Sequence, residues 1–155
     1  MWSGSLTVFD GSGIIIGMAD MFDKQKRSEI MSAVKGKNSR AELLAFRHLR
    51  RRKIYFQKHY RRALGCPDIA LPRRKKAVFI DGNFWHGRSY AELLEKYGED
   101  NFWTEKIGKN VARDRAQRAQ LVADGWQVFQ VWESDINRMR TRGETLASIE
   151  RFLLD

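Results

Sequence analysis

The stretch GCPDIALPRRKKAVFIDGNFWHG, Gly65–Gly87, decides how the rest of the chain is interpreted. Its two short apolar runs, 68–71 and 77–81, predict two strands, and a proline stops the first of them. Asp68 begins the first strand and Asp81 ends the second, so an antiparallel hairpin would place the two carboxylates side by side. The second strand is continuously apolar, which is typical of a central strand.

The composition is that of one globular domain with a sizeable core. The chain has 155 residues, and 43% of them are apolar. Its single cysteine, Cys66, excludes an internal disulfide and a cysteine-cluster metal site. No apolar run approaches the roughly 20 residues that a bilayer-spanning helix needs. We therefore expect a cytoplasmic protein with no membrane partner.

The charge balance favours a polyanionic partner. The formal net charge is +10 and the isoelectric point is near 10.0. The chain nevertheless contains 19 Asp and Glu residues. A pure nucleic-acid scaffold has little use for acids near its basic surface, whereas an enzyme that binds metal on a phosphodiester requires them.

The first 20 residues differ from the rest because they contain no Lys or Arg. Residues 1–17 are interpreted as an upstream extension outside the core, and Met18 as the natural start. On this interpretation residues 18–155 form a single domain. The alternative is that the extension supplies a real extra strand that packs on the domain.

The remaining pattern predicts helices on both faces of a mixed sheet. Ser39 and Glu42 form a capping box ahead of an apolar helical pattern. The other predicted elements are helices over 23–37, 39–52, 91–97, 102–124 and 143–154, and strands over 54–58 and 126–132, the latter buried. This order predicts an α/β fold and fits a restriction-endonuclease-like core, although other small α/β folds share it.

The two aspartates of the hairpin have two interpretations. Together they could hold one hard cation through oxygen and leave positions for water and phosphate. Alternatively, each caps a turn, since Pro-Asp and Asp-Gly are ordinary turn dipeptides. His86 lies five residues past Asp81 and could activate water, although a lone histidine is more often structural. His48 and His59 have the sequence context of surface residues.

Two further acids are candidates for the same site. Asp114 shares an apolar helical face with Ile107 and Leu121. It either pairs with Arg118 one turn later or points into a site beside His86. For Glu42 the capping box is a sufficient explanation, but a helix start that borders a metal site would allow both roles.

Aromatic pairs and basic clusters complete the pattern. Phe84-Trp85 and Phe102-Trp103 fit core packing, or wedges that enter a base step of DNA. Basic side chains around the candidate site would contact phosphates and make binding salt-dependent. The bases expected to do so are Lys106, Lys109, Arg113, Arg73 and Arg74.

The chain from about Met18 to Ile136 resembles the very short patch repair (Vsr) mismatch endonucleases. The stretches that carry the resemblance are DKQKRSEIM, RAELLAFRHL, GCPDIAL, VFIDGNFWHG, FWTEKIGKNVARDR and GWQVFQVWE. The resemblance implies a restriction-endonuclease-like fold and a magnesium-dependent enzyme. It also implies nicking of one DNA strand beside the T of a T:G mismatch, in DNA repair.

The resemblance also assigns roles to individual residues. Asp68 becomes a metal ligand together with the main-chain carbonyl of Ile80. His86 becomes the group that activates the attacking water, with Asp114 supporting it. Glu42 lies near the metal-bound waters. The aromatic residues that wedge into the duplex become Phe84, Trp85 and Trp103.

The sequence departs from the family's pattern in two places. Well-known members hold a structural zinc where this chain has Asn83, Arg88, Tyr90 and Ser134, none of which is a usual zinc ligand. We therefore predict no zinc and a loop after His86 that packing holds. Asp81 stands where some members have histidine, and it would add a second carboxylate to the metal.

The resulting prediction is a magnesium-dependent endonuclease that acts on T:G-mismatched duplex DNA as a monomer, in the bacterial cytoplasm at the nucleoid. Mismatch-repair proteins are candidate partners. The alternatives are a related DNA nickase with another target, and a non-catalytic DNA-binding module. The last alternative predicts that Asp68→Ala leaves function intact.

Overall fold

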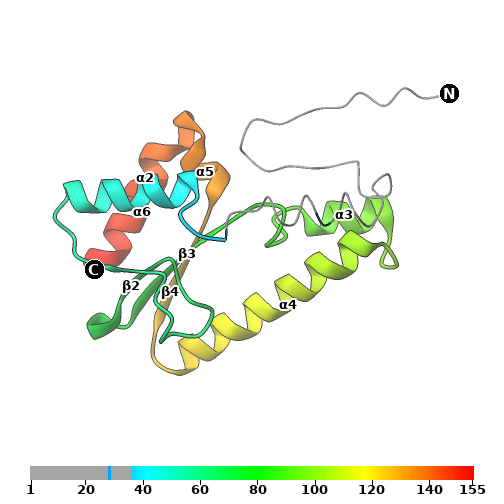
Figure 1. Ribbon diagram of the computed structural model, residues 1–155, viewed down its shortest axis with the longest axis horizontal. Coiled ribbons are helices and arrows are strands. Elements are labelled where there is room, and N and C mark those ends of the chain that lie inside the picture. The colour runs from blue at the N-terminus through cyan, green and yellow to red at the C-terminus, as the bar shows by residue number, and fades with distance from the viewer. Residues whose placement is uncertain (1–27, 29–35) are drawn as a thin grey trace.

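A computed structural model of the chain describes Ser28 and residues 36–155 (Figure 1). The extension at 1–17 and the start expected at Met18 lie outside the described residues. So does the helix expected over 23–37, except for Ser28 and its last two positions.

The described residues form a mixed α/β structure around a four-stranded sheet. The strands are β1 (Gln57–Lys58), β2 (Ile69–Leu71), β3 (Lys76–Asp81) and β4 (Gln127–Trp132), in that spatial order. The first two pairings are antiparallel and β3 pairs with β4 in parallel. Every residue of β3 is buried, which confirms the predicted central strand.

The described residues also form five α-helices: α2 (Arg40–Arg51), α3 (Tyr90–Tyr97), α4 (Phe102–Ala123), α5 (Glu133–Asn137) and α6 (Met139–Leu154). Helices α2, α4, α5 and α6 pack on the sheet, and α3 packs against the start of α4. Alternate side chains of β3 face opposite layers, as the strand's period of two requires. Val78 and Ile80 pack with α2, α5 and α6, whereas Ala77 and Phe79 pack towards Leu121 of α4 (Figure 1). None of the described helices is long and apolar enough to cross a membrane.

Several elements differ from the prediction by more than one residue at an end or in their place in the fold. Only Gln57–Lys58 of the strand expected over 54–58 joins the sheet. The strand expected to be buried, β4, lies at the sheet edge, and Gln127 and Gln130 are exposed. Helix α5 was not predicted, and α6 begins at Met139 rather than Gly143, because the Arg142 guanidinium binds the last carbonyls of α5 and joins the two helices.

The basic turn between β2 and β3 lies at the opposite end of the hairpin from the aspartates. A 3-10 turn, Pro72–Arg74, occupies it. The Arg74 guanidinium donates to the last two carbonyls of α6, Leu153 O and Leu154 O, at 2.7 and 3.0 Å. The buried Lys76 ammonium donates to Phe152 O at 2.7 Å. This placement does not support the prediction that the turn's bases contact DNA beside the acids.

Candidate active site

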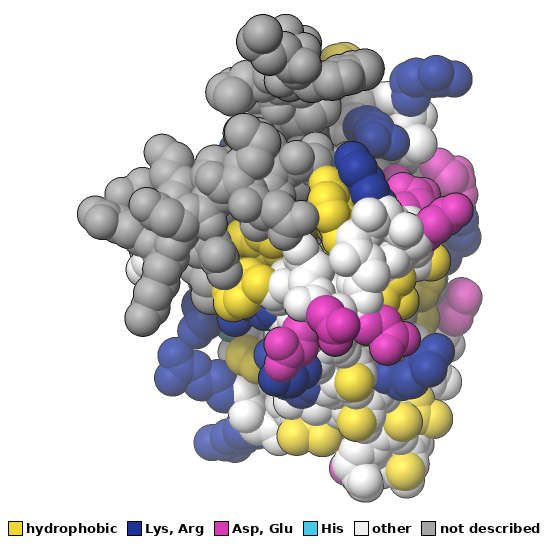
Figure 2. Space-filling model, turned by 90° about the vertical axis from the view of Figure 1, so that its right-hand side faces the viewer, with side chains coloured by type: hydrophobic (Ala, Val, Ile, Leu, Met, Phe, Trp, Pro, Cys, Tyr) yellow, Lys and Arg dark blue, Asp and Glu magenta, His cyan; other side chains and the backbone are white. Residues whose placement is uncertain are grey.

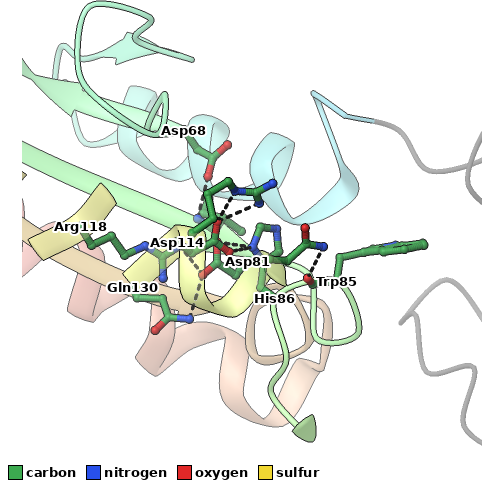
Figure 3. Close-up of polar contacts among 10 residues, drawn as sticks. Asp68, Asp81, Trp85, His86, Asp114, Arg118 and Gln130 are labelled. Atoms are coloured by element: carbon green, nitrogen blue, oxygen red, sulfur yellow. Dashed lines mark hydrogen bonds and ion pairs between the residues drawn. The ribbon is translucent and has the colours of Figure 1, made fainter. Parts of the chain in front are cut away.

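An open cleft of about 800 Å³ lies where α2, the β1–β2 loop, the end of β3 and α4 meet. The acids and the histidine predicted as catalytic all line it. The close-up in Figure 3 shows side chains from β3, the following loop and α4 converging there. The predicted residues that the cleft brings together are Glu42, Asp68, Ile80, Asp81, Trp85, His86, Arg113 and Asp114.

Asp68 is held at the base of the cleft with few partners. Its Oδ2 accepts a hydrogen bond of 2.7 Å from the Ile80 N–H. Burial raises the pKa of Asp68 to about 7, against the opposing effect of this hydrogen bond, and the Glu42 and Asp81 charges raise it further. A buried carboxylate in this condition gains free energy from a nearby cation.

Asp81 has a different environment, although the two aspartates are close enough to interact electrostatically. It is 3% exposed, and its Oδ2 accepts hydrogen bonds from Arg118 at 2.6 Å and Gln130 at 2.8 Å. Its Oδ1 lies 3.7 Å from His86 Nδ1. One oxygen is therefore already engaged, and the metal-ligand role of Asp81 stays a prediction.

The sequence left open whether Asp114 pairs with Arg118 or points towards His86, and the structure shows the second arrangement. Asp114 Oδ2 lies 2.6 Å from His86 Nδ1, while Arg118 pairs with Asp81 instead. Arg113 donates to the other oxygen of Asp114 at 2.9 Å. The reason is tertiary: α4 crosses the end of β3, which brings Asp81 within reach of Arg118.

The His86–Asp114 pair has the electrostatics of an acid–base group. Burial alone would lower the pKa of His86, but the Asp114 hydrogen bond and the charges of Asp81 and Asp114 together raise it. Burial alone would raise the pKa of Asp114, but its hydrogen bonds with His86 and Arg113 lower it. Because an ionised carboxylate only accepts, Nδ1 carries the proton and Nε2 is left for water.

Tight packing positions the loop that carries His86. The His86 N–H donates to Gly82 O at 3.1 Å, and Asn110 of α4 donates to Trp85 O at 3.1 Å. Gly87 has φ +73°, and a Cβ there would lie 2.4 Å from Val111 Cγ2. The loop can approach α4 this closely only because residue 87 is glycine.

Glu42 is buried at the start of α2 and has two functions. The Ser39 hydroxyl accepts from the Glu42 N–H at 3.3 Å, as the predicted capping box requires. The Glu42 carboxylate does not return to Ser39. Its Oε2 accepts from the Asn38 N–H at 2.9 Å and lies 2.5 Å from His59 Nε2, so the side chain faces the cleft as well as the helix start.

His59 is the site residue that sequence reasoning missed. Its side chain is 14% exposed and lines the cleft, so the prediction of a surface residue was wrong. The signal that could have found it was strand register. Lys58 pairs with Ile69, and the next residue, His59, donates its backbone N–H to Asp68 O at 3.1 Å.

The aromatic residues form a cluster beside the cleft. The rings of Phe84, Trp85 and Trp103 contact one another edge to face at 5.0 to 5.9 Å. Trp103 is only 3% exposed and packs with Leu93 and Ile107, so the core alternative describes it well. Phe84 and Trp85 are half-buried, and Trp85 points away from the polar residues in Figure 3.

Two of the positions compared with zinc ligands contact each other directly. Arg88 donates to the Ser134 hydroxyl at 2.6 Å and to Asp135 at 2.9 Å, with its guanidinium over the Trp132 ring. Tyr90 packs against Gly108 of α4. The loop after His86 is therefore held by packing, as predicted, and also by an ion pair that was not predicted.

The predicted bases of α4 lie beside acidic side chains. Lys109 pairs with Glu105 at 2.6 Å. Figure 2 looks at the end formed by α3 and the start of α4, where acidic side chains gather among basic ones. The exposed acids of α3 and the turn after it are Glu92, Glu95, Glu99 and Asp100. The basic side chains that line the cleft itself are Lys37, Arg61, Arg113 and Arg118.

Comparison with known proteins identifies the family. The family model described as DNA mismatch endonuclease Vsr matches residues 19–92. The chain is 34% identical to DNA mismatch endonuclease Vsr of Escherichia coli K12 over 116 residues, covering 75% of this chain and 74% of that protein. This chain belongs to the Vsr family. The resemblance noted from its sequence motifs is thereby confirmed.

Other relatives of this Vsr-family protein are nicking enzymes. It is 33% identical to the Type II nicking enzyme V.NmeAIP of Neisseria meningitidis serogroup A over 138 residues, covering 89% of this chain and 99% of that protein. It is 32% identical to the Type II nicking enzyme V.HpaIIP of Haemophilus parainfluenzae over 122 residues, covering 77% and 85%. The protein is therefore a DNA endonuclease.

Proposed function

We propose that this Vsr-family protein nicks one strand of duplex DNA beside a T:G mismatch, using Mg²⁺, in very short patch repair. The observation that carries the proposal is the placement of Asp68 and the His86–Asp114 pair in one cleft. The runner-up is a DNA nickase with another target, which the names of the nicking-enzyme relatives favour. A non-catalytic DNA-binding module is the third candidate.

The residues present fit a hard divalent cation. Asp68 is a buried carboxylate that accepts a hydrogen bond from the Ile80 N–H, and oxygen ligands of this kind suit Mg²⁺. Asp68 and the Ile80 main-chain carbonyl would hold the ion, with Asp81 as a further ligand and Glu42 near its waters. An ion held there would supply Lewis-acid polarisation of the scissile phosphate and neutralise charge in the transition state.

Water activation falls to His86. Its Nδ1 is tied to Asp114, so Nε2 takes the proton from the attacking water and Asp114 stabilises the imidazolium that forms. The Asp114 hydrogen bond and the charges of Asp81 and Asp114 raise the pKa of His86. The imidazole therefore becomes neutral, and able to accept a proton, at a higher pH than an ordinary histidine. The side chains Lys37, Arg61 and Arg113 at the cleft would contact phosphates on either side of the scissile bond.

The aromatic cluster is proposed as the mismatch-sensing element. Phe84 and Trp85 are half-buried beside the cleft and could enter a base step, with the buried Trp103 supporting them from below. Lys106 and Lys109 of α4 would contact the backbone near this wedge. For Arg74 such a contact would require release of the α6 carbonyls, and Arg73 lies beside it.

The wider setting is part of the same proposal. We propose that residues 18–155 fold as one restriction-endonuclease-like domain that acts as a monomer on DNA in the bacterial cytoplasm, at the nucleoid and in company with mismatch-repair proteins. Sedimentation of the free chain, and of its complex with one duplex, measures the mass of each and so tests whether the protein is a monomer in both.

The test compares two end-labelled duplexes in Mg²⁺, one with a single T:G and one fully paired. We expect a nick in the T-containing strand of the mismatched duplex only, and its loss in Asp68→Ala. A matched control is His48→Gln, which removes a histidine paired with Glu150 outside the cleft. Equal cutting of both duplexes would favour the nickase with another target, and binding without cutting would favour the DNA-binding module.

A further inference from the structure

We propose that Glu42, His59 and Asp68 together form a three-ligand site for a divalent cation, and that the His59 imidazole makes this site prefer Mn²⁺ or Co²⁺ over Mg²⁺. The inference deepens the proposed function and rests on it, because Asp68 belongs to both. It adds a nitrogen ligand that neither the sequence pattern nor the family resemblance indicated.

Three separate parts of the chain supply the ligand atoms. Glu42 comes from the first turn of α2, His59 from the end of β1, and Asp68 from the residue before β2. One ligand atom from each lies within 4.8 Å of the other two. The side chains of Glu42 and His59 are 6% and 14% exposed, so the cluster is at the base of the cleft rather than on a solvated surface.

A backbone hydrogen bond and a neighbouring ring fix the position of the His59 side chain. Its φ is +46°, in the left-handed region that a residue with a Cβ seldom adopts. The N–H of His59 donates to Asp68 O at 3.1 Å, which fixes its distance from the candidate ligand. The imidazole packs edge-on against Phe46, which restricts its orientation.

Backbone donors orient the two carboxylates of the site. The Asn38 N–H binds Glu42 at 2.9 Å, and the Ile80 N–H binds Asp68 at 2.7 Å. Such hydrogen bonds from outside the ligand set fix ligand geometry at metal sites. The His59–Glu42 contact of 2.5 Å has to open to about 3 Å when both atoms bind one ion at bond lengths near 2.1 Å.

The mixed ligand set determines the preferred ion. Mg²⁺ prefers oxygen ligands and a regular octahedron, whereas imidazole favours the later divalent metals. Two carboxylates and one imidazole therefore suit Mn²⁺ or Co²⁺ better than Mg²⁺. The competing explanation is that His59 only satisfies the buried Glu42 by a hydrogen bond, and this explanation predicts no effect of His59 on metal selectivity.

The test measures metal binding without DNA, by titration calorimetry of the full chain with Mn²⁺, Co²⁺ and Mg²⁺ separately. We expect His59→Gln to weaken Mn²⁺ and Co²⁺ binding about tenfold or more, and Mg²⁺ binding less than about twofold. The matched control is His48→Gln, whose histidine also pairs with a glutamate but lies outside the cleft. Equal loss for all three ions, or no loss, would overturn the inference.

A second measurement reads the nitrogen ligand directly and does not depend on how well the variant folds. Electron spin echo of the Mn²⁺-bound wild-type chain should show coupling to an imidazole nitrogen. That coupling should persist in His86→Gln and disappear in His59→Gln. Absence of nitrogen coupling in the wild type, or its loss only in His86→Gln, would contradict the proposal. Nicking with no nitrogen coupling would leave the proposed function intact, and coupling with no nicking would leave the metal site intact.

Discussion

Two imidazole–carboxylate pairs face the same cleft, and their environments differ. His86 and Asp114 are 2.6 Å apart, and His59 and Glu42 are 2.5 Å apart. The His86 side chain is 30% exposed, and its acid is paired with Arg113. The His59 side chain is 14% exposed. An oxygen of Asp68 lies within 4.8 Å of the ligand atoms of both His59 and Glu42.

The difference shows that an imidazole–carboxylate contact does not define a role by itself. A general base needs access to water and an acid that stays ionised, which the partly exposed His86 and the paired Asp114 provide. A metal ligand needs further ligand atoms close enough to share one ion, and among the described residues Glu42, His59 and Asp68 form such a group, with ligand atoms within 4.8 Å of one another. The surroundings of each pair therefore assign its chemistry.

The largest expected effect comes from breaking the first pair. His86→Gln removes the proposed base while keeping a polar side chain of similar reach, so we expect nicking at saturating metal to fall by about 10³-fold. Single-turnover cleavage of the T:G duplex measures this. Metal binding should stay within about twofold of wild type, and a parallel loss of metal affinity would contradict separate roles for the two pairs.

The next effect concerns Asp68, the acid that lies near the second pair. Its pKa of about 7 in the folded chain exceeds the ordinary value of 3.8, so without metal the folded state loses stability as pH rises from about 4 to 7. Asp68→Asn removes this loss. We expect the metal-free variant to exceed wild type by roughly 2–4 kcal/mol at pH 8 and by little at pH 4.

Chemical denaturation in a chelating buffer at the two pH values measures this gap. Added Mn²⁺ or Mg²⁺ should narrow it at pH 8, because a bound cation stabilises the wild-type carboxylate and not the amide. A gap that is independent of pH would contradict the raised pKa of Asp68.

A smaller effect should follow when the His86–Asp114 contact keeps a side chain of similar size but loses the carboxylate charge. Asp114→Asn should lower the pKa of His86, since the hydrogen bond and charge that raise it are lost. The base is active when neutral, so the acid limb of the kcat/KM profile should move to lower pH. The rate at the optimum should drop about 10- to 100-fold, because the amide no longer stabilises the imidazolium. A lower rate with an unmoved acid limb would mean that Asp114 is only structural.

The smallest effect should come from the contact between Arg88 and α5, which holds the loop after His86. Arg88→Gln breaks the bonds to Ser134 and Asp135, and we expect about a two- to fivefold loss of nicking with a Tm only a few degrees lower. Exposed Arg140→Gln is the matched surface control. Mn²⁺ affinity should not change, because the second pair is held by other elements.

Local pattern was sufficient to predict the hairpin, the central strand and the long helix that presents Asp114. Each depends on a continuous apolar run or a helical repeat. The partners of Asp81 and the place of His59 were not predictable in this way. They follow from how α4 crosses β3 and from where a two-residue strand ends, which are tertiary facts. Helix α5 escaped notice because five residues are too few for a periodic signal.

The cations at the β2–β3 turn have a consequence for how this chain responds to salt. Lys76 and Arg74 bind the carbonyls at the end of α6. The negative end of the α6 helix dipole therefore already neutralises part of their charge. DNA binding releases counterions only for the phosphates that free cations meet. The dependence of affinity on ionic strength will therefore report a smaller contact set than the formal charge of +10 suggests, and part of the basic composition serves to hold a helix to a sheet.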